Sequence, residues 1–547
     1  MYAILASIAL LLTIVAPAGA VGGPLLSFTS PATERVDVAM DAACAVEGAC
    51  DLTTSLCTSG MIGMACQTAT DCAGRINTCR IVVTPSSADA LSIAARLDGK
   101  LVAGFAPASP GVPLVVDVQL DPRRRHNRLR IKARGMVSGR MTKQDDMFRF
   151  SAVPEIRYRP LPARFGVPAS AERLDTLITS ANDRAIRQHA WQIWAGLTAR
   201  TPERFNGRRL PVFETWFSGA ELYDPRPYAC EDVLRRAFDR DFERPSQFIH
   251  GGALPNEQVT GFNRFNREVV QHVCERSYNQ ASVLDALNAS FGTDTAIGAR
   301  DIDPFPRAAV ALKPVFTTVA QSGLTILPYW AGPTASSNLV NPTPDTWTQC
   351  VAVVPPGTDA PSSPTSCTCN GIPDYPCEVV PLKRFYAFPL TADEVAEMSN
   401  DASLVGTGVV PGDYAVLVAM HVTTKETPRW AWQTFWWSPT PNASPAGDDR
   451  IAGVKREFRN YVMCTAWTMN GPPESLTGTP QVCFNPYLET GLPGIDGVQS
   501  NCMTCHQMAA WPNFSTNYQA NGFVSPDDPL FGASLKLDFL WSVTRAQ

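Results

Sequence analysis

The 547-residue sequence is short of histidine, of net charge and of long apolar runs. Its formal net charge is only −5, which gives no indication of a nucleic-acid partner or of an acidic substrate. Beyond residue 16 no segment is apolar over the ~20 residues that a membrane-spanning helix requires. The Cys-x-x-Cys pattern occurs once only, so the sequence lacks the paired motif of a four-cysteine zinc site.

The N-terminal residues predict export. Residues 3–16 are almost entirely apolar, and Ala18 and Ala20 are small residues at the positions that signal peptidase reads. We therefore expect a signal peptide over 1–20 and a periplasmic or secreted protein of a bacterium. No lysine or arginine precedes the apolar run, so an uncleaved anchor is the alternative. The residues directly after Ala20 include no cysteine, so a lipid anchor is not indicated. The 16 cysteines fit an oxidising compartment.

Two small N-terminal regions are predicted before residue 160. The first, 21–80, holds six cysteines among small and polar residues, which predicts three disulfides, with a metal site as the less favoured alternative. The second, 81–160, alternates apolar and polar residues and predicts a small antiparallel, sandwich-like β domain. One strand face there would carry four basic residues, either as an ordinary solvated face or as a contact for an acidic partner, a glycan or the cell surface: Arg128, Arg130, Lys132 and Arg134.

The remainder, 161–547, predicts a large mixed region, so the fold class is α+β. Apolar spacing indicates helices within 171–199, 230–242 and 262–287, and strands with proline-rich loops after residue 304. Three further groups of cysteines could form disulfides: Cys230 with Cys274, Cys464 with Cys483, and two bonds among Cys350, Cys367, Cys369 and Cys377.

The most informative motif is Cys502-Met503-Thr504-Cys505-His506. Two thiols three positions apart followed by an imidazole are what covalent haem attachment needs, because each thiol adds to one vinyl group and the histidine binds the iron. A redox Cys-x-x-Cys or a zinc half-site is the alternative. We therefore predict one covalent haem c held by Cys502 and Cys505, with His506 as an iron ligand.

The second iron ligand is expected upstream of the motif. The one later methionine, Met508, is too close to reach across the porphyrin. The runs 414–423 and 429–437 flank a short polar turn and predict a β-hairpin, in which Met420 and His421 point to opposite faces. His421 is the first candidate for a distal ligand or hydrogen-bond donor, and the reserves are His250, His272, Met420 and Lys425.

The second strand of this hairpin is rich in tryptophan. Alternation places Trp430, Trp432, Thr434 and Trp436 on one face, where they would form an aromatic wall beside the haem. Trp430 and Trp432 are therefore candidate haem contacts. The alternative is an ordinary core in which His421 is a hydrogen-bonded internal histidine.

Several stretches of the chain match one family: 189–197, 210–216, 305–313, the hairpin tryptophans, 501–506 and 538–542. In these the chain resembles a group of bacterial single-haem cytochrome c family proteins over about residues 165–547. The resemblance implies a haem domain over 161–547, attachment at Cys502 and Cys505, and His506 as proximal ligand, but no particular reaction. A weaker likeness is to cytochromes whose haem is also cross-linked to a lysine, for which Lys313 and Lys425 are the candidates.

Three functions remain open on the sequence. An electron carrier with an unidentified redox partner protein comes first. A haem enzyme with an open iron site, acting on peroxide or a nitrogen oxide with His421 or Arg429 assisting proton transfer, is the second. The third is a surface-binding protein in which the haem is a redox relay.

Overall fold

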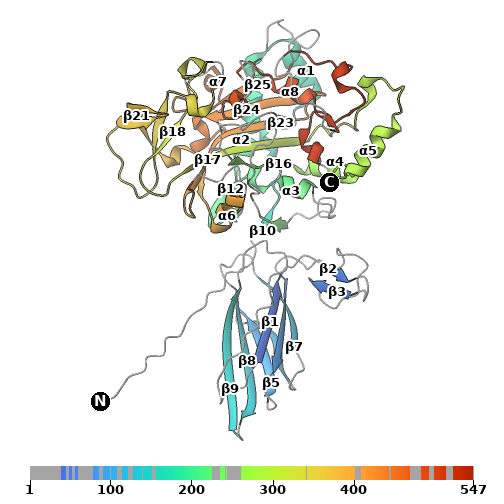
Figure 1. Cartoon of the computed structure of the whole chain (residues 1–547), viewed down its shortest axis with the longest axis vertical. Coiled ribbons are helices and arrows are strands. Elements are labelled where there is room, and N and C mark those ends of the chain that lie inside the picture. Colours follow the sequence, from blue (N-terminus) through green and yellow to red (C-terminus); the bar gives the residue numbers. More distant parts are fainter. Residues whose placement is uncertain are drawn as a thin grey trace. The chain divides into compact units, whose positions relative to one another are not determined.

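The computed structural model divides into two compact units, 1–156 with 235–238, and 157–234 with 239–547. Figure 1 shows the chain with its elements labelled. In the first unit the structure describes the strands between residues 38 and 150 and a few residues next to them. The signal peptide over 1–20, His250 and Cys230 lie outside the described residues, which continue over 155–223, 235–238, 240, 242, 260–339, 342–400, 408–442, 445–468, 482–491, 498–512 and 522–545.

The described part of unit 1 contains two antiparallel sheets, a short hairpin and the pair that β10 (Glu155–Arg157) forms with β14 (Arg235–Ala237). The three-stranded sheet has the order β1 (Val38–Cys44), β4 (Thr78–Pro85), β7 (Leu114–Gln119). The four-stranded sheet has the order β6 (Lys100–Pro107), β5 (Ala90–Leu97), β8 (Asn127–Val137), β9 (Arg140–Phe150), and the hairpin joins β2 (Ala49–Asp51) to β3 (Leu56–Ser59). Strands β1 and β4 therefore take residues of the cysteine-rich region into a sheet with β7, where Cys44 lies opposite Cys79.

The alternation expected in the β domain is present on β8. Leu129 is fully buried, whereas its neighbours Arg128 and Arg130 are exposed. The boundary between the units falls at residue 156, close to the end of the range assigned to this domain.

Unit 2 is built on an antiparallel sheet whose strands run across its middle in Figure 1. The order is β13 (Phe217–Ser218), β16 (Arg264–Phe265), β17 (Val310–Val319), β23 (Tyr414–Thr424), β24 (Ala431–Trp437), β25 (Tyr461–Ala466), with β15 (Thr260–Gly261) beside β17 and β22 (Ala387–Pro389) beside β23. The hairpin predicted over 414–437 is confirmed as β23 and β24.

Helices cover one face of this sheet. The helical pattern over 171–199 forms α1 (Ala171–Thr179) and α2 (Asp183–Leu197), whose N-terminal N–H groups are capped by Ser170 and Asn182. From α2 the Trp194 ring stacks on Phe435 of β24 with 4.2 Å between ring centroids. Odd-numbered residues of β24 therefore face α2, and even-numbered residues face the opposite side.

The other helical predictions have mixed outcomes. The range 262–287 contains α4 (Arg267–Glu275) and most of α5 (Ala281–Ser290). A helix over 230–242 is wrong for the described residues, which include the strand β14 (Arg235–Ala237). Further elements of unit 2 are β11 (Arg200–Phe205), β12 (Arg208–Pro211), α3 (Gly219–Tyr223), α6 (Ala392–Asn400), α7 (Pro445–Asp448), β26 (Ala510–Trp511) and β27 (Leu535–Lys536).

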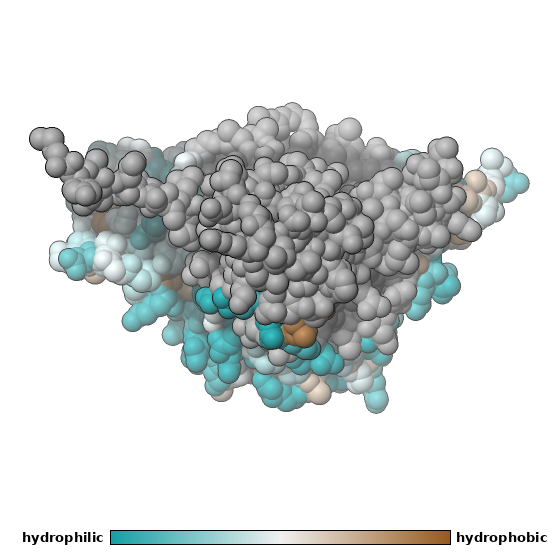
Figure 2. All heavy atoms as spheres, turned by 90° about the horizontal axis from the view of Figure 1, so that it is seen from below, coloured by the Kyte–Doolittle hydropathy of each residue, from teal (hydrophilic) through white to brown (hydrophobic). Residues whose placement is uncertain are grey.

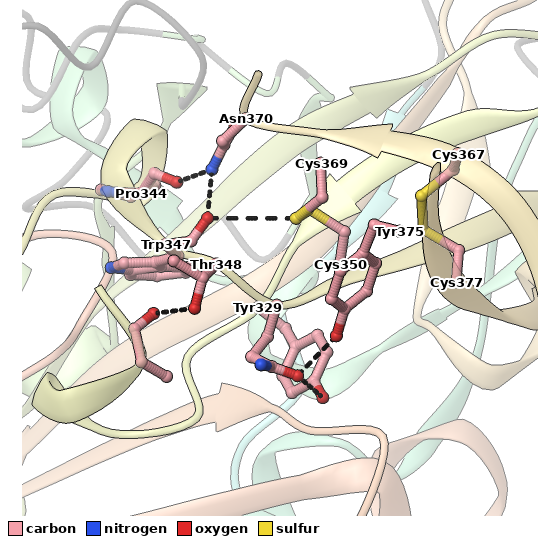
Figure 3. Close-up of a disulfide and its surroundings, with 12 residues drawn as sticks. Tyr329, Pro344, Trp347, Thr348, Cys350, Cys367, Cys369, Asn370, Tyr375 and Cys377 are labelled. Carbon is pink, nitrogen blue, oxygen red and sulfur yellow. Dashed lines mark hydrogen bonds between the residues drawn. A yellow bond between two sulfur atoms is a disulfide. The ribbon is translucent and has the colours of Figure 1, made fainter. Parts of the chain in front are cut away.

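A separate four-stranded sheet carries two disulfides. Its order is β18 (Thr325–Pro328), β19 (Cys350–Val354), β21 (Ile372–Pro381), β20 (Thr365–Cys369). The four cysteines pair as Cys350–Cys369 and Cys367–Cys377, so the two predicted bonds are present. In Figure 3 the carbonyl of Trp347 accepts a hydrogen bond of 2.8 Å from Asn370, which fixes the turn next to Cys369.

The described surface carries isolated apolar side chains. The exposed large ones are Leu101, Leu324, Leu339, Ile372, Val410 and Val482, on separate elements or loops. In the face shown in Figure 2 the described residues are mostly hydrophilic. No helix within the described ranges has the length and apolar character needed to cross a bilayer.

Candidate haem attachment site

The motif lies on the short helix α8 (Cys502–Gln507). The Asn501 side chain begins the helix by accepting hydrogen bonds from the N–H groups of Met503 and Thr504. One helical turn separates Cys502 from Cys505, so both thiols project from the same face. Both are free, whereas the other cysteines within the fully described ranges are disulfide-bonded. The motif therefore presents two unpaired thiols, whereas the other cysteines described between residues 260 and 545 are in disulfides.

Both thiols are held in the neutral form. Burial, followed by the charge of Glu489, raises the pKa of Cys505 to about 12 and that of Cys502 well above its ordinary value. The Cys502 thiol also donates to the carbonyl of Cys483 at 3.1 Å. These thiols are poor nucleophiles toward disulfides and oxidants, because the thiolate is the reactive form in those reactions.

His506 is oriented by the chain's C-terminal segment. Its Nδ1 lies 2.8 Å from the carbonyl oxygen of Phe539. A carbonyl can only accept, so Nδ1 carries the proton and Nε2 keeps its lone pair, which is the tautomer that binds a metal through Nε2. Burial lowers the pKa of His506 to about 3, and nearby His421 and Lys313 act in the same direction, so the imidazole is neutral at pH 7.

The sheet face opposite α2 brings the hairpin to the motif. His421 on β23 lies opposite Lys313 on β17 and Thr434 on β24, and cross-strand partners share a face. Trp432, two residues before Thr434, is on that face and contacts the His506 ring with 4.0 Å between centroids. The structure thus brings His421, Lys313 and Trp432 together beside His506.

Met420 points the other way, as the alternation predicts. It is fully buried in the main core of unit 2, on the side of the sheet that packs against α2. Met420 therefore lies on the side of the sheet away from the motif. His421 lies on the side that faces His506, and its distal role stays a prediction.

Glu489 joins the site although the sequence analysis did not single it out. It lies in the 3-10 helix η11 (Glu489–Gly491), and one carboxylate oxygen is 2.8 Å from Nε2 of His421. The other oxygen accepts from the backbone N–H of Asn485, whose side chain in turn donates to Thr434 at 2.8 Å. Nothing in the local sequence marks this glutamate, because its partner is 68 positions away along the chain.

Trp430 is not on the tryptophan face. It precedes β24 with φ 60°, and its backbone N–H closes the turn on Thr427. Its indole N–H donates to the carbonyl of Asp538 at 2.8 Å, and its ring contacts Phe305. The expected alignment of Trp430 with Trp432, Thr434 and Trp436 is therefore wrong. Of those three, Trp432 contacts His506, whereas Trp436 packs against the cluster that contains Trp347 and Leu488.

Lys425 and His272, the other described candidates for the second iron ligand, have other partners. Lys425 forms an ion pair with Asp538 at 2.5 Å, and His272 lies against the carbonyl of Asp303 at 3.0 Å. Of the two lysines considered for a haem cross-link, Lys313 is therefore the one placed beside His506.

A disulfide braces the segment before the motif. Cys464 on β25 is bonded to Cys483, as the sequence predicts. The backbone N–H of Cys483 donates to Ser500 at 3.0 Å, directly before the helix that carries the thiols. This bond ties the approach to α8 to the central sheet.

The comparisons with known proteins give no match: no family model, no curated protein and no solved structure is similar to this chain. The zinc half-site that the motif also allows would need further ligands. Within the described ranges no group of three or more His, Cys, Asp or Glu side chains is arranged to hold a metal ion.

Proposed function

We propose that this protein is an exported single-haem c-type cytochrome with a redox function, and that electron transfer is its main role. The observation that carries the proposal is the pair of free thiols one turn apart, directly before a neutral His506 whose Nε2 is left available. A haem bound there would supply one-electron redox chemistry. Cys502 and Cys505 would hold it covalently, and His506 would be the proximal ligand.

The surrounding residues suit this role. Trp432 and the disulfide at Cys464 shield and brace the proximal side, and His421 is the candidate distal group. His506 would hold the haem iron, and a second ligand from His421 would close the site to small molecules, which favours electron transfer over catalysis. The protein sets the potential through axial ligation and burial.

The proposed location is the periplasm or the exterior of a bacterium. The disulfides of unit 2 are compatible with such an oxidising compartment. The partner would be a redox protein of unidentified class rather than a nucleic acid. Unit 1, with the exposed Arg128 and Arg130, is the proposed contact with a glycan or the cell surface.

A second function is favoured by one contact. His421 Nε2 and Glu489 Oε1 are 2.8 Å apart, so the carboxylate fixes the proton on Nε2 and leaves Nδ1 as the ring nitrogen that can accept or return a proton. In an open-site haem enzyme, this pair would handle the protons of a bound peroxide or nitrogen oxide. Lys313, opposite His421, would add a positive charge to the same face.

The deciding experiment is the optical spectrum of the full chain produced with a cytochrome c assembly system, in ferric, reduced and CO-treated forms. A low-spin spectrum without a response to CO supports the electron carrier. A high-spin spectrum that shifts with CO supports the enzyme. A protein without haem, indistinguishable from the matched variant Cys502→Ser/Cys505→Ser, contradicts both.

A further inference from the structure

The carbonyl that orients His506 comes from an unusual backbone. Asp538 and Phe539 are consecutive non-glycine residues with φ 44° and 68°. Left-handed conformations cost free energy for residues with a Cβ atom, and they persist only where surrounding contacts impose them. The conformation of Asp538 and Phe539 therefore depends on the contacts that hold these two residues.

Three donors hold Asp538. The Nζ of Lys425 is 2.5 Å from one carboxylate oxygen, and the backbone N–H of Phe305 donates to the other at 2.8 Å. The indole N–H of Trp430 donates to the backbone carbonyl of Asp538 at 2.8 Å. The Lys425 and Asp538 side chains are only 7% and 10% exposed. The residue before Phe539 is thus fixed at both its side chain and its carbonyl.

The hairpin turn that provides Lys425 is itself anchored from the other side. Lys425 Nζ also donates to the carbonyl of Pro428 across the turn at 2.6 Å. The next residue, Glu426, pairs with His189 of α2 at 3.0 Å. The turn therefore connects the helix-covered core of unit 2 to the segment that contacts His506.

We infer that the buried Lys425–Asp538 ion pair is a positioning device that holds the Phe539 carbonyl against Nδ1 of His506 and so sets the donor strength of the axial imidazole. This inference rests on the proposed haem attachment. A hydrogen bond from the non-ligating nitrogen makes the imidazole a stronger donor and favours the ferric state. Loss of the bond would shift the equilibrium toward the ferrous state and raise the reduction potential.

The test is the reduction potential of the haem-loaded full chain carrying Lys425→Met/Asp538→Asn. This double variant leaves the net charge unchanged, so that a shift reports the positioning rather than the local charge. We expect the ferrous form to be favoured about tenfold, a rise of ~59 mV for one electron. We also expect faster hydrogen exchange of the His506 Nδ1–H by nuclear magnetic resonance.

The matched control is Lys536→Met/Asp301→Asn, which removes a second lysine–aspartate pair, at 3.4 Å, involving the same C-terminal segment. Its potential should equal that of the wild type. An unchanged potential and a protected Nδ1–H in the Lys425→Met/Asp538→Asn variant would overturn the inference, as would an equal shift in the control.

Trp430→Phe covers the case in which the double variant does not fold. It removes the indole N–H to Asp538 and part of a fully buried ring, but it leaves Lys425 and Asp538 in place. It should raise the potential in the same direction by a smaller amount, and a wild-type potential in this variant counts against the inference. A wild-type chain without covalent haem would instead refute the proposed function, so the two failures are distinguishable.

Discussion

Replacing His189 by leucine should destabilise unit 2 by about 3 kcal/mol at pH 7. His189 and Glu426 are 0% and 1% exposed, and their Nε2 and Oε1 atoms are 3.0 Å apart. Removing His189 takes a hydrogen-bond partner from a buried carboxylate, which costs ~3 kcal/mol or more when the group left behind is charged. Glu426 would retain hydrogen bonds from the Ala169 N–H and the Thr424 hydroxyl, at 2.6 and 2.7 Å, so the lower end of that range is expected.

The pH dependence has a definite sign. Burial alone would raise the pKa of Glu426, but the hydrogen bond and charge of His189, together with the two other donors, lower it below its ordinary 4.5 overall. A carboxyl group with a lowered folded-state pKa stabilises the protein above its unfolded pKa, and this contribution is lost as the pH falls through the folded value. The difference between wild type and His189→Leu should therefore shrink below pH 4.5.

The assay is guanidinium chloride unfolding of the full chain, followed by far-ultraviolet circular dichroism at pH 7 and pH 4. Glu426→Leu and the double variant complete a mutant cycle, in which we expect a coupling free energy of about 2 kcal/mol. A loss below about 1 kcal/mol for His189→Leu at pH 7, or a difference that grows on acidification, would refute this reasoning.

Three further predictions follow from the site. Alanine in place of His421 should change the ferric spectrum and increase CO binding, and an unchanged spectrum would remove His421 from the distal side. Deleting residues 21–150 should leave the haem spectrum intact while any attachment to cells or glycan is lost; loss of the haem bands would show that unit 1 supports the haem region. Because the pKa of His506 is about 3, the apoprotein should lose stability on acidification between about pH 6.5 and pH 3. The melting temperature of the variant His506→Gln should fall less over this range, and equal falls would contradict the neutral state of the imidazole.

Local patterns in the sequence predicted the elements that approach the site. The alternation in 414–437 was enough to give the hairpin and to separate Met420 from His421. The apolar pattern over 171–199 did not show that two helices are present. The structure ends α1 at Thr179 and begins α2 at Asp183. Periodicity therefore identified the faces of these elements better than their ends.

Contacts between distant residues could not be predicted. The range 230–242 has a helical pattern, but the structure has a strand at 235–237. Arg240 is held by buried ion pairs with Glu214 and Glu394, at 3.0 and 2.5 Å, which the pattern does not show. Trp430 fits the alternation of β24, yet the turn continues through it because its N–H bonds to Thr427. The pairing of His421 with Glu489 depends on the tertiary fold in the same way, since neither residue has a local signal for the other.

The central claim is covalent haem attachment on α8, and the most direct test is the mass of the denatured protein produced with a cytochrome c assembly system. We predict the added mass of one haem, located by proteolysis on the peptide that contains Cys502 and Cys505. The variant Cys502→Ser/Cys505→Ser should lack it. A wild-type protein that retains no haem after denaturation, or whose two cysteines are joined in a disulfide, would contradict the account.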